Sequence, residues 1–173
     1  QLPLTVTQEQ VSYFACPDPS RFGPDRFPVW IWMDDPCYYG FPTFGEPAIK
    51  IARDVGGDEV TADTRTFQPN EANLAGALGF LERYLPDAVG PLHFAKTCLY
   101  TLTPDRDFVV DRVPGHDGIV VLIGAGHAFK FASALGQVAS ELALDGETRS
   151  DLSLFALARP VLRERDPVKN FMV

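Results

Sequence analysis

Residues 92–103 read LHFAKTCLYTLT, residues 108–113 read FVVDRV, and residues 118–123 read GIVVLI. These segments are rich in β-branched and aromatic residues and are separated by turn-forming residues, so they predict three β-strands. Asp117 and Gly118 are typical of a tight turn and predict the connection between the last two strands. A sheet is therefore expected in the second half of the chain.

A glycine turn and a helix follow these strands. The turn is GAG at residues 124–126, and the apolar spacing of residues 129–144 predicts a helix with Gly146 as its C-cap. The turn is not a full dinucleotide fingerprint, G-x-G-x-x-G, because Phe129 stands where a third small residue is needed. Free N–H groups at the start of a helix, together with the charge of Lys130, nevertheless suit an anion or a ring oxygen that becomes negative during a reaction. The alternative is a glycine turn with a structural role only.

The first half of the chain predicts further strands and another helix. The strands are expected at residues 6–14, 29–33, 38–41 and 48–53, with a hairpin turn at 34–36 and a polar loop at 56–69. Leucines at positions 74, 78, 81 and 85 follow helical spacing, with Asn70 as the N-cap and Pro86 as the stop. The whole pattern predicts an α+β fold with a mixed, largely antiparallel sheet and two main helices.

The composition is that of a folded protein and argues against two classes of partner. Hydrophobic residues make up 46% of the chain and charged residues 22%, so a core can be buried. The net charge of -8 argues against binding to nucleic acid or to an anionic membrane surface. The best apolar run, Ile119–Ile123, is far shorter than the ~20 residues of a membrane-spanning helix.

The cysteines indicate the cellular compartment, and the first residues indicate how the chain begins. Cys16, Cys37 and Cys98 are odd in number and lack metal-ligand spacing, so we expect neither a disulfide framework nor a metal site. A cytoplasmic location is predicted. The chain begins at Gln1 without a Met or a signal-peptide pattern, and we interpret this start as a cut end.

Two further segments carry candidate chemistry. Strand alternation places Lys96, Cys98 and Tyr100 on one face, and a lysine two residues from a cysteine favours the nucleophilic thiolate. The alternative for Cys98 is a packing role, as for most cysteines in strands. The second segment is the aromatic hairpin YYGFP at residues 38–42, followed by Lys50, and its alternative role is also core packing.

Together these segments resemble the monomeric sarcosine oxidase and N-methyltryptophan oxidase family of flavin-dependent amine oxidases. The similarity rests on the YYGFP hairpin with Lys50, on CLYT at residues 98–101 and on GHAFKF at residues 126–131, and it extends through nearly the whole chain. It implies that residues 1–90 are part of a substrate-binding sheet. Residues 91–173 would be the C-terminal segment that completes an FAD-binding domain, whose N-terminal Rossmann half is absent from this chain.

The resemblance also implies a role for each site residue. Cys98 matches the cysteine that is joined to FAD by a thioether. Lys50 matches a lysine on the flavin N5 side that promotes reaction with oxygen, and Lys130 matches one that helps hold the substrate carboxylate. Tyr39 and Tyr100 match tyrosines that line the substrate cavity. The other residues at matching cofactor positions are Gly124, Gly126, His127 and Phe129.

The implied activity is oxidation of a secondary amine, such as an N-methyl amino acid, by FAD and O2, giving an aldehyde, the amino acid and hydrogen peroxide. Asp54 stands near a position where sarcosine oxidases carry a histidine, so a related flavin enzyme for a cyclic or longer amine is an alternative. A further alternative is a non-catalytic module or subunit that pairs with a separate flavin-binding chain. As given, the chain is expected to lack FAD and oxidase activity and to self-associate through an exposed apolar face.

Overall fold

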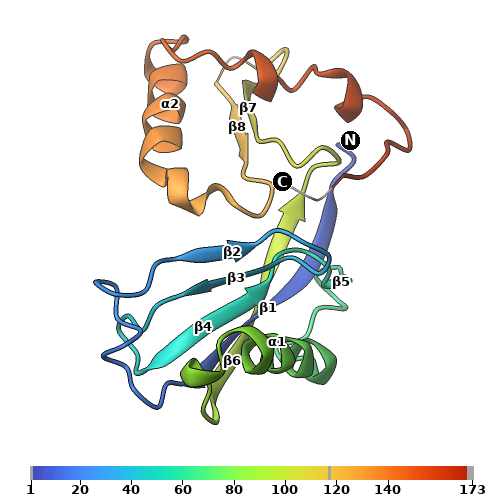
Figure 1. The fold of residues 1–173 in the computed structure, drawn as a ribbon. Helices are drawn as coiled ribbons and strands as arrows, with labels where there is room; N and C mark the ends of the chain where they lie inside the picture. Colours follow the sequence, from blue (N-terminus) through green and yellow to red (C-terminus); the bar gives the residue numbers. More distant parts are fainter. Residues whose placement is uncertain (1, 117, 171–173) are drawn as a thin grey trace. The chain divides into compact units, whose positions relative to one another are not determined.

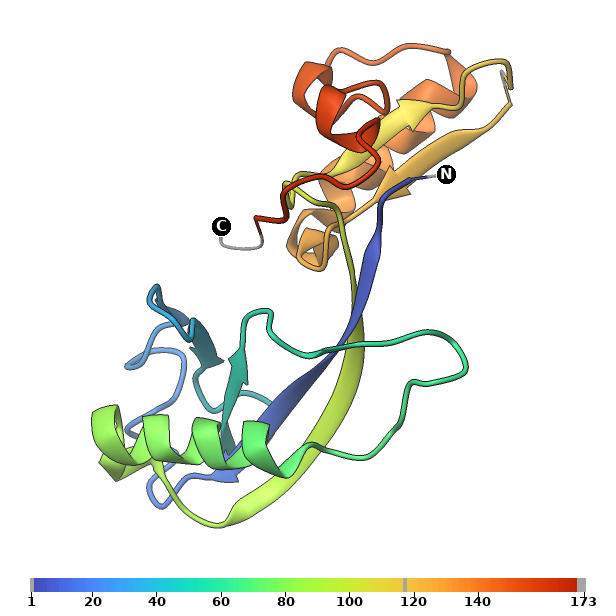
Figure 2. The same cartoon turned by 90° about the vertical axis from the view of Figure 1, so that its right-hand side faces the viewer.

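The computed structural model describes residues 2–116 and 118–170 (Figures 1 and 2). The chain divides into two compact units. The first, here called the sheet unit, is Thr7–Leu99, and the second, the terminal unit, combines Gln1–Val6 with Tyr100–Val173. The sheet unit ends at Leu99, within strand β6, so most of this strand belongs to the sheet unit.

Six strands form the main sheet, in the order β2-β3-β4-β1-β5, with β6 also pairing with β1. Their bounds are Thr5–Ala15 (β1), Trp30–Trp32 (β2), Tyr38–Phe41 (β3), Ala48–Arg53 (β4), Asp58–Glu59 (β5) and Leu92–Leu102 (β6). The β1–β4, β1–β5, β2–β3 and β3–β4 pairs are antiparallel. The predicted hairpin of β2 and β3 is therefore confirmed, whereas the predicted loop at 56–69 contains the short strand β5.

Side chains alternate across β4 and distinguish the two faces of the sheet. Ile49 and Ile51 are fully buried and pack with Phe14 in the core beneath α1 (Glu71–Tyr84). Lys50 lies between the two isoleucines and therefore points to the opposite face, since successive residues of a strand alternate. We call the side of the sheet away from α1 the helix-free face.

Helix α1 begins where the sequence predicts. The side chain of Asn70 accepts the backbone N–H groups of Ala72, at 2.9 Å, and Asn73, at 3.1 Å, so Asn70 is the N-cap. The helix ends at Tyr84, and Pro86 then starts a short 3-10 helix, because proline cannot continue the α-helical hydrogen bonds. The predicted helix and both of its end signals are confirmed.

The terminal unit contains a strand pair and a helix. Their bounds are Val109–Arg112 (β7), Val120–Ile123 (β8) and Ala132–Leu144 (α2). The two strands are antiparallel, and Val110 of β7 shares a buried apolar cluster with Val138 and Leu142 of α2. The predicted turn residue Asp117 lies outside the described residues.

Two expectations for the second helix are wrong. The α-helix begins at Ala132 and not at residue 129, because a 3-10 helix over Ala128–Phe131 comes first. Its C-cap is Asp145, and Gly146 follows with a φ of 79°, a left-handed conformation that glycine adopts readily. The positive end of the α-helix dipole therefore does not lie at Gly126.

The α+β class with a largely antiparallel sheet is confirmed, and the part of the chain that the structure describes contains two α-helices. Neither of these helices combines the length and the apolar character that a membrane crossing requires.

Gly57→Ala should destabilise the protein, whereas Gly79→Ala should stabilise it. A Cβ at Gly57 would lie 2.0 Å from the carbonyl oxygen of Gln8 on β1, but a Cβ at Gly79, within α1, meets nothing within 4 Å. We expect urea unfolding to show a loss of about 1–3 kcal/mol for Gly57→Ala. The same measurement should show a gain of about 0.5–1 kcal/mol for Gly79→Ala. Equal stabilities of the two variants would contradict the close approach of residue 57 to β1.

Candidate active site

Lys50 lies within a row of aromatic side chains on the helix-free face. It is directly opposite Phe41 in the β3–β4 pair and directly opposite Tyr13 in the β1–β4 pair, and opposed residues point to the same face of a sheet. The Lys50 Nζ lies 4.7 Å from the ring centroid of Phe41 and 5.7 Å from that of Tyr39, within the range of cation–π attraction. The structure thus brings the predicted residues Tyr39 and Lys50 together.

The aromatic row continues onto β6. The rings of Tyr13 and Phe94 stack, with 4.4 Å between their centroids. Cys98 follows Phe94 by four residues on the same strand, so its side chain points to the same face. Lys50 and Cys98 interact electrostatically, each influencing the pKa of the other. The helix-free face therefore carries a lysine and a cysteine among aromatic rings.

Burial governs the protonation of both reactive groups. It lowers the pKa of Lys50, and it raises the pKa of Cys98. The carboxylate of Glu9 raises the pKa of Cys98 further, whereas the positive charges of Lys50 and Arg65 lower it. Burial and Glu9 together outweigh the two cations, so the pKa of the Cys98 thiol is raised overall.

The expectation that Lys96 favours the thiolate of Cys98 is wrong. The Lys96 Nζ lies over the ring of Phe94, 5.2 Å from its centroid. Phe94 precedes Lys96 on the strand and Cys98 follows it, so the ammonium is directed away from the thiol. Alternation identifies the shared face correctly, but it does not give the direction in which a long side chain extends.

Glu9 is a buried acidic residue that acts electrostatically on Cys98, and the sequence alone did not single it out. It is 4% exposed, and its carboxylate accepts hydrogen bonds from the Thr7 hydroxyl, at 2.6 Å, and from the Gly57 N–H, at 3.1 Å to Oε2. Burial raises the pKa of Glu9, and these two hydrogen bonds oppose the shift. The signal was present in the sequence: Glu9 occupies the same alternating set of β1 positions as Tyr13, where a charge is unusual.

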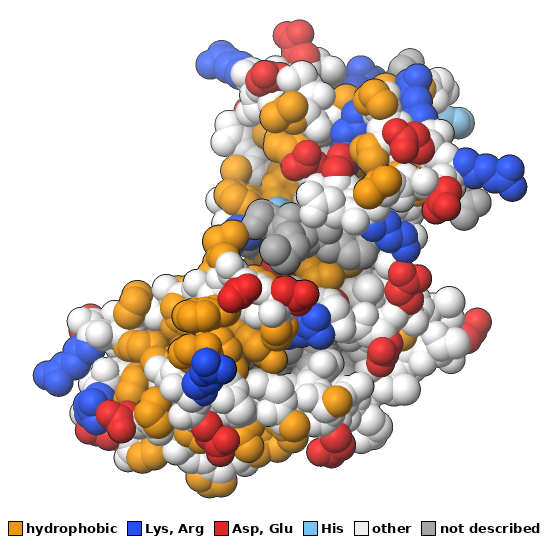
Figure 3. Space-filling model, turned by 45° about the vertical axis from the view of Figure 1, so that its right-hand side comes forward, with side chains coloured by type: hydrophobic (Ala, Val, Ile, Leu, Met, Phe, Trp, Pro, Cys, Tyr) orange, Lys and Arg blue, Asp and Glu red, His pale blue; other side chains and the backbone are white. Residues whose placement is uncertain are grey.

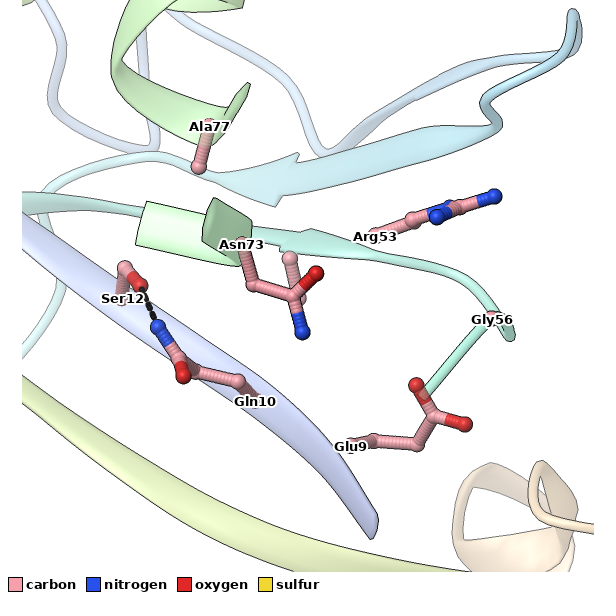
Figure 4. Close-up of a pocket in the computed structure, with 8 residues that line it drawn as sticks. Glu9, Gln10, Ser12, Arg53, Gly56, Asn73 and Ala77 are labelled. Atoms are coloured by element: carbon pink, nitrogen blue, oxygen red, sulfur yellow. Dashed lines mark hydrogen bonds between the residues drawn. The ribbon is translucent and has the colours of Figure 1, made fainter. Parts of the chain in front are cut away.

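A small pocket adjoins Glu9 where β1 and β4 diverge beyond their last pair, Val11 and Ala52. Polar side chains line much of it, and Gln10 donates a hydrogen bond to Ser12 at 3.3 Å (Figure 4). The remaining lining residues are Ala52, Arg53, Gly56, Asn73 and Ala77. Its volume of about 10 Å³ is close to the minimum for one water molecule, so it is too small for a substrate.

The other predicted site residues lie in the terminal unit. Gly126 has a φ of 80°, and a Cβ on it would lie 2.5 Å from the ring of Tyr100, so only glycine allows this close approach. His127 Nε2 lies 3.1 Å from the carbonyl oxygen of Arg106. Lys130 donates to the His127 carbonyl oxygen at 2.9 Å. The structure therefore brings Tyr100 to the glycine turn and folds Lys130 back onto it.

The remaining predicted residues serve as turn and surface positions. A Cβ on Gly124 would lie 2.4 Å from the Cβ of Ala128, so the turn also needs glycine at this position. Phe129 is 93% exposed, whereas phenylalanine is usually buried in folded proteins.

Among the described residues, no three His, Cys, Asp or Glu side chains come together as a metal site.

Comparison with known proteins identifies the family of this chain. Residues 1–142 match the family DAO, described as FAD dependent oxidoreductase. The chain belongs to this family. The match covers both the strands that carry Lys50 and Cys98 and the glycine turn at 124–126.

Named relatives are similar along nearly the whole chain. Monomeric sarcosine oxidase from Bacillus sp. (strain B-0618) is 37% identical over 171 residues, which cover 94% of this chain and 43% of that protein. Monomeric sarcosine oxidase from Arthrobacter sp. (strain TE1826) is 33% identical, with 97% and 44% covered. N-methyl-L-tryptophan oxidase from Salmonella typhi is 34% identical, with 92% and 43% covered. The chain thus spans less than half the length of the curated relatives it matches.

Solved structures share the fold at lower sequence identity. The amino acid oxidase NikD, essential for nikkomycin biosynthesis, has a TM-score of 0.72 at 23% identity and covers 90% of this chain and 42% of its own. Amadoriase I from Aspergillus fumigatus, a fructosyl amine:oxygen oxidoreductase, has a TM-score of 0.70 at 20% identity, with 88% and 38% covered. These likenesses confirm the fold.

Glu9→Gln should make the stability of the protein less dependent on pH. Because the pKa of Glu9 is raised in the folded state, the folded protein binds this proton more tightly than the unfolded chain does. The stabilising effect of the proton is fully present below the unfolded pKa and is lost as the pH rises through the folded pKa. The neutral variant should therefore be more stable than the wild type at pH 8 and similar to it at pH 4, as measured by thermal unfolding. A variant that is less stable at pH 8 would contradict the dominance of burial.

Proposed function

We propose that the complete protein is an FAD-dependent oxidase of secondary amines, such as N-methyl amino acids, and that this chain contributes its C-terminal part. The observation that carries the proposal is the pairing of Lys50 and Cys98 on the aromatic helix-free face. Membership of the FAD-dependent family, and similarity to monomeric sarcosine oxidase and N-methyl-L-tryptophan oxidase, support this activity.

The residues of the helix-free face suit a flat, electron-poor ring system. Aromatic side chains offer a planar apolar surface, a lysine offers positive charge, and a cysteine offers a nucleophile. FAD, when bound, takes two electrons from the amine and passes them to O2, which yields hydrogen peroxide and an imine that water hydrolyses to the aldehyde and the amino acid. The protein would contribute position and charge to this chemistry.

Three residues of the sheet unit then have proposed roles. Cys98 would form a thioether with FAD and hold the cofactor in place. Lys50, a partly desolvated cation, would stabilise the negative charge that oxygen acquires during reoxidation. Tyr39, whose ring lies beside the Lys50 ammonium, would line the amine cavity.

The resemblance also suggests tasks for residues of the terminal unit. Lys130 would hold the substrate carboxylate, and Tyr100 would line the amine cavity. The turn residues Gly124, Gly126, His127 and Phe129 would approach the cofactor. Residues 1–90 would belong to the substrate-binding sheet and residues 91–173 to the FAD-binding domain, with an N-terminal Rossmann half as the partner of both.

Two finer features belong to the same proposal. Among the described residues no disulfide joins Cys16, Cys37 and Cys98, which suits a reducing, cytoplasmic compartment. Hydrophobic side chains also gather on the surface of the sheet unit (Figure 3). Ile31 on β2 is 63% exposed, and Met33, which follows this strand, is 71% exposed. Such a surface would bind the remainder of the protein or, in its absence, a second copy of this chain.

A second candidate is a related flavin enzyme that acts on a cyclic or longer amine. Asp54 and Glu9 interact electrostatically, and both are acidic. An additional acidic group near the amine cavity favours a substrate with a second positive or hydrogen-bonding group. A comparison of turnover with sarcosine, a cyclic amino acid and a diamine by the full-length protein would distinguish the two candidates.

Cys98 should carry FAD covalently in the full-length protein. Lys50 and Arg65 favour the thiolate needed for the thioether, although burial and Glu9 raise the pKa of the thiol overall. Mass spectrometry of the denatured protein should give the mass of the chain plus one FAD, and Cys98→Ser should remove this increase. Cys37→Ser is the matched control and should keep it. Release of all flavin on denaturation would contradict the proposed attachment.

Lys50→Met should slow reoxidation of the flavin in the full-length protein far more than amine oxidation. Methionine keeps the apolar stem beside Phe41 but removes the charge. In stopped-flow absorbance we expect reoxidation by O2 to fall by about tenfold or more, since a preorganised charge at the site of a developing anion contributes at least this much. Reduction by the amine should change little. Slower reduction with unchanged reoxidation would assign Lys50 another role.

A further inference from the structure

Glu9 and Cys98 are neighbours across the β1–β6 strand pair. The Ala15 N–H donates to the carbonyl oxygen of Pro91, and Tyr13 stacks on Phe94, so residue numbers fall along β1 as they rise along β6. The two strands are therefore antiparallel. Moving four residues along each strand from the stacked pair leads to Glu9 on β1 and Cys98 on β6, both on the helix-free face.

Contacts on the other face show that the same parts of the two strands lie together. Gln8 and Thr97, which precede Glu9 and Cys98 in sequence, both bond to Thr66. The Gln8 Nε2 donates to the Thr66 hydroxyl at 3.1 Å, and the Thr97 hydroxyl donates to the Thr66 carbonyl oxygen at 3.4 Å. Because the strands are antiparallel, Gln8 and Thr97 are diagonal neighbours when Glu9 faces Cys98, and both then lie within reach of Thr66.

We infer that Glu9 is a positioning residue that restrains the nucleophilicity of Cys98. A buried carboxylate beside a thiol opposes the loss of the thiol proton, because two negative charges would then face each other in a medium of low polarity. The Thr7 hydroxyl and the Gly57 N–H hold the carboxylate in place. Its position is therefore fixed by the fold.

The charged groups around Cys98 come from four elements. Glu9 on β1 opposes the thiolate, whereas Lys50 on β4 and Arg65 in the loop before α1 favour it. Lys96 on the same strand is directed toward Phe94. Removal of the Glu9 charge should therefore shift Cys98 toward the thiolate, and removal of the Lys50 charge should shift it the other way. A restrained thiol is also protected from oxidation, which requires the thiolate.

The inference is tested by alkylation of the 173-residue chain with iodoacetamide between pH 6 and pH 10, with each cysteine peptide quantified by mass spectrometry. Below the thiol pKa, a shift of one unit changes the thiolate fraction about tenfold, so Glu9→Gln should speed alkylation of Cys98 by about two- to tenfold at pH 7.5. Lys50→Met should slow it. Cys37 serves as the internal control and should be unaffected.

Matched variants separate charge from packing. Asp58→Asn removes a carboxylate from β5 at the position opposite Gln8, on the other face of the sheet, and should leave Cys98 unchanged. Glu9→Asp keeps the charge, so its rate should stay close to that of the wild type. An unchanged alkylation rate of Cys98 in Glu9→Gln would overturn the inference. So would an alkylation rate in Glu9→Asp as fast as that expected for Glu9→Gln. The assay contains no flavin, so its failure would leave the proposed oxidase function standing.

Discussion

The register of β4 between β1 and β3 is the constraint on which the candidate site depends. Lys50 faces Phe41 on one side and Tyr13 on the other, while Ile49 and Ile51 fill the core beneath α1. A slip of one residue would turn the lysine into the core and the isoleucines into solvent. Burial of the isoleucines, each favourable by roughly 1.5–3 kcal/mol, thus fixes the position of the charge. The same side chains that stabilise the sheet orient its reactive face.

The helix-free face combines partial burial with charge, and this combination determines its chemistry. A lysine in full solvent has little effect on a group several ångströms away, because water screens the interaction. Lys50 is only partly exposed and lies against aromatic rings, so its field reaches Cys98. Glu9 opposes that field from the neighbouring strand. The reactivity of the cysteine is therefore set by a balance among side chains that three strands and a loop hold in place.

The glycine turn of the terminal unit depends on backbone conformations that most residues avoid. Ala125 and Gly126 both have positive φ values, and the absence of a Cβ at Gly126 lets the backbone lie against Tyr100. Lys130 then donates to the His127 carbonyl oxygen, so the 3-10 helix directs the ammonium back toward the turn. The 3-10 helix leaves the lysine close to the turn residues.

The sequence by itself determined most of the elements and the family. Periodicity and end signals placed α1 and its N-cap Asn70, as well as the strand at 48–53, because these features depend on residues close together in the chain. Tertiary structure alone decided which charges meet. Glu9 and Cys98 are 89 residues apart in sequence, and only the pairing of β1 with β6 brings them together. Lys96 lies two residues from Cys98 and yet extends toward Phe94, because a long side chain follows its packing partners and not its sequence neighbours.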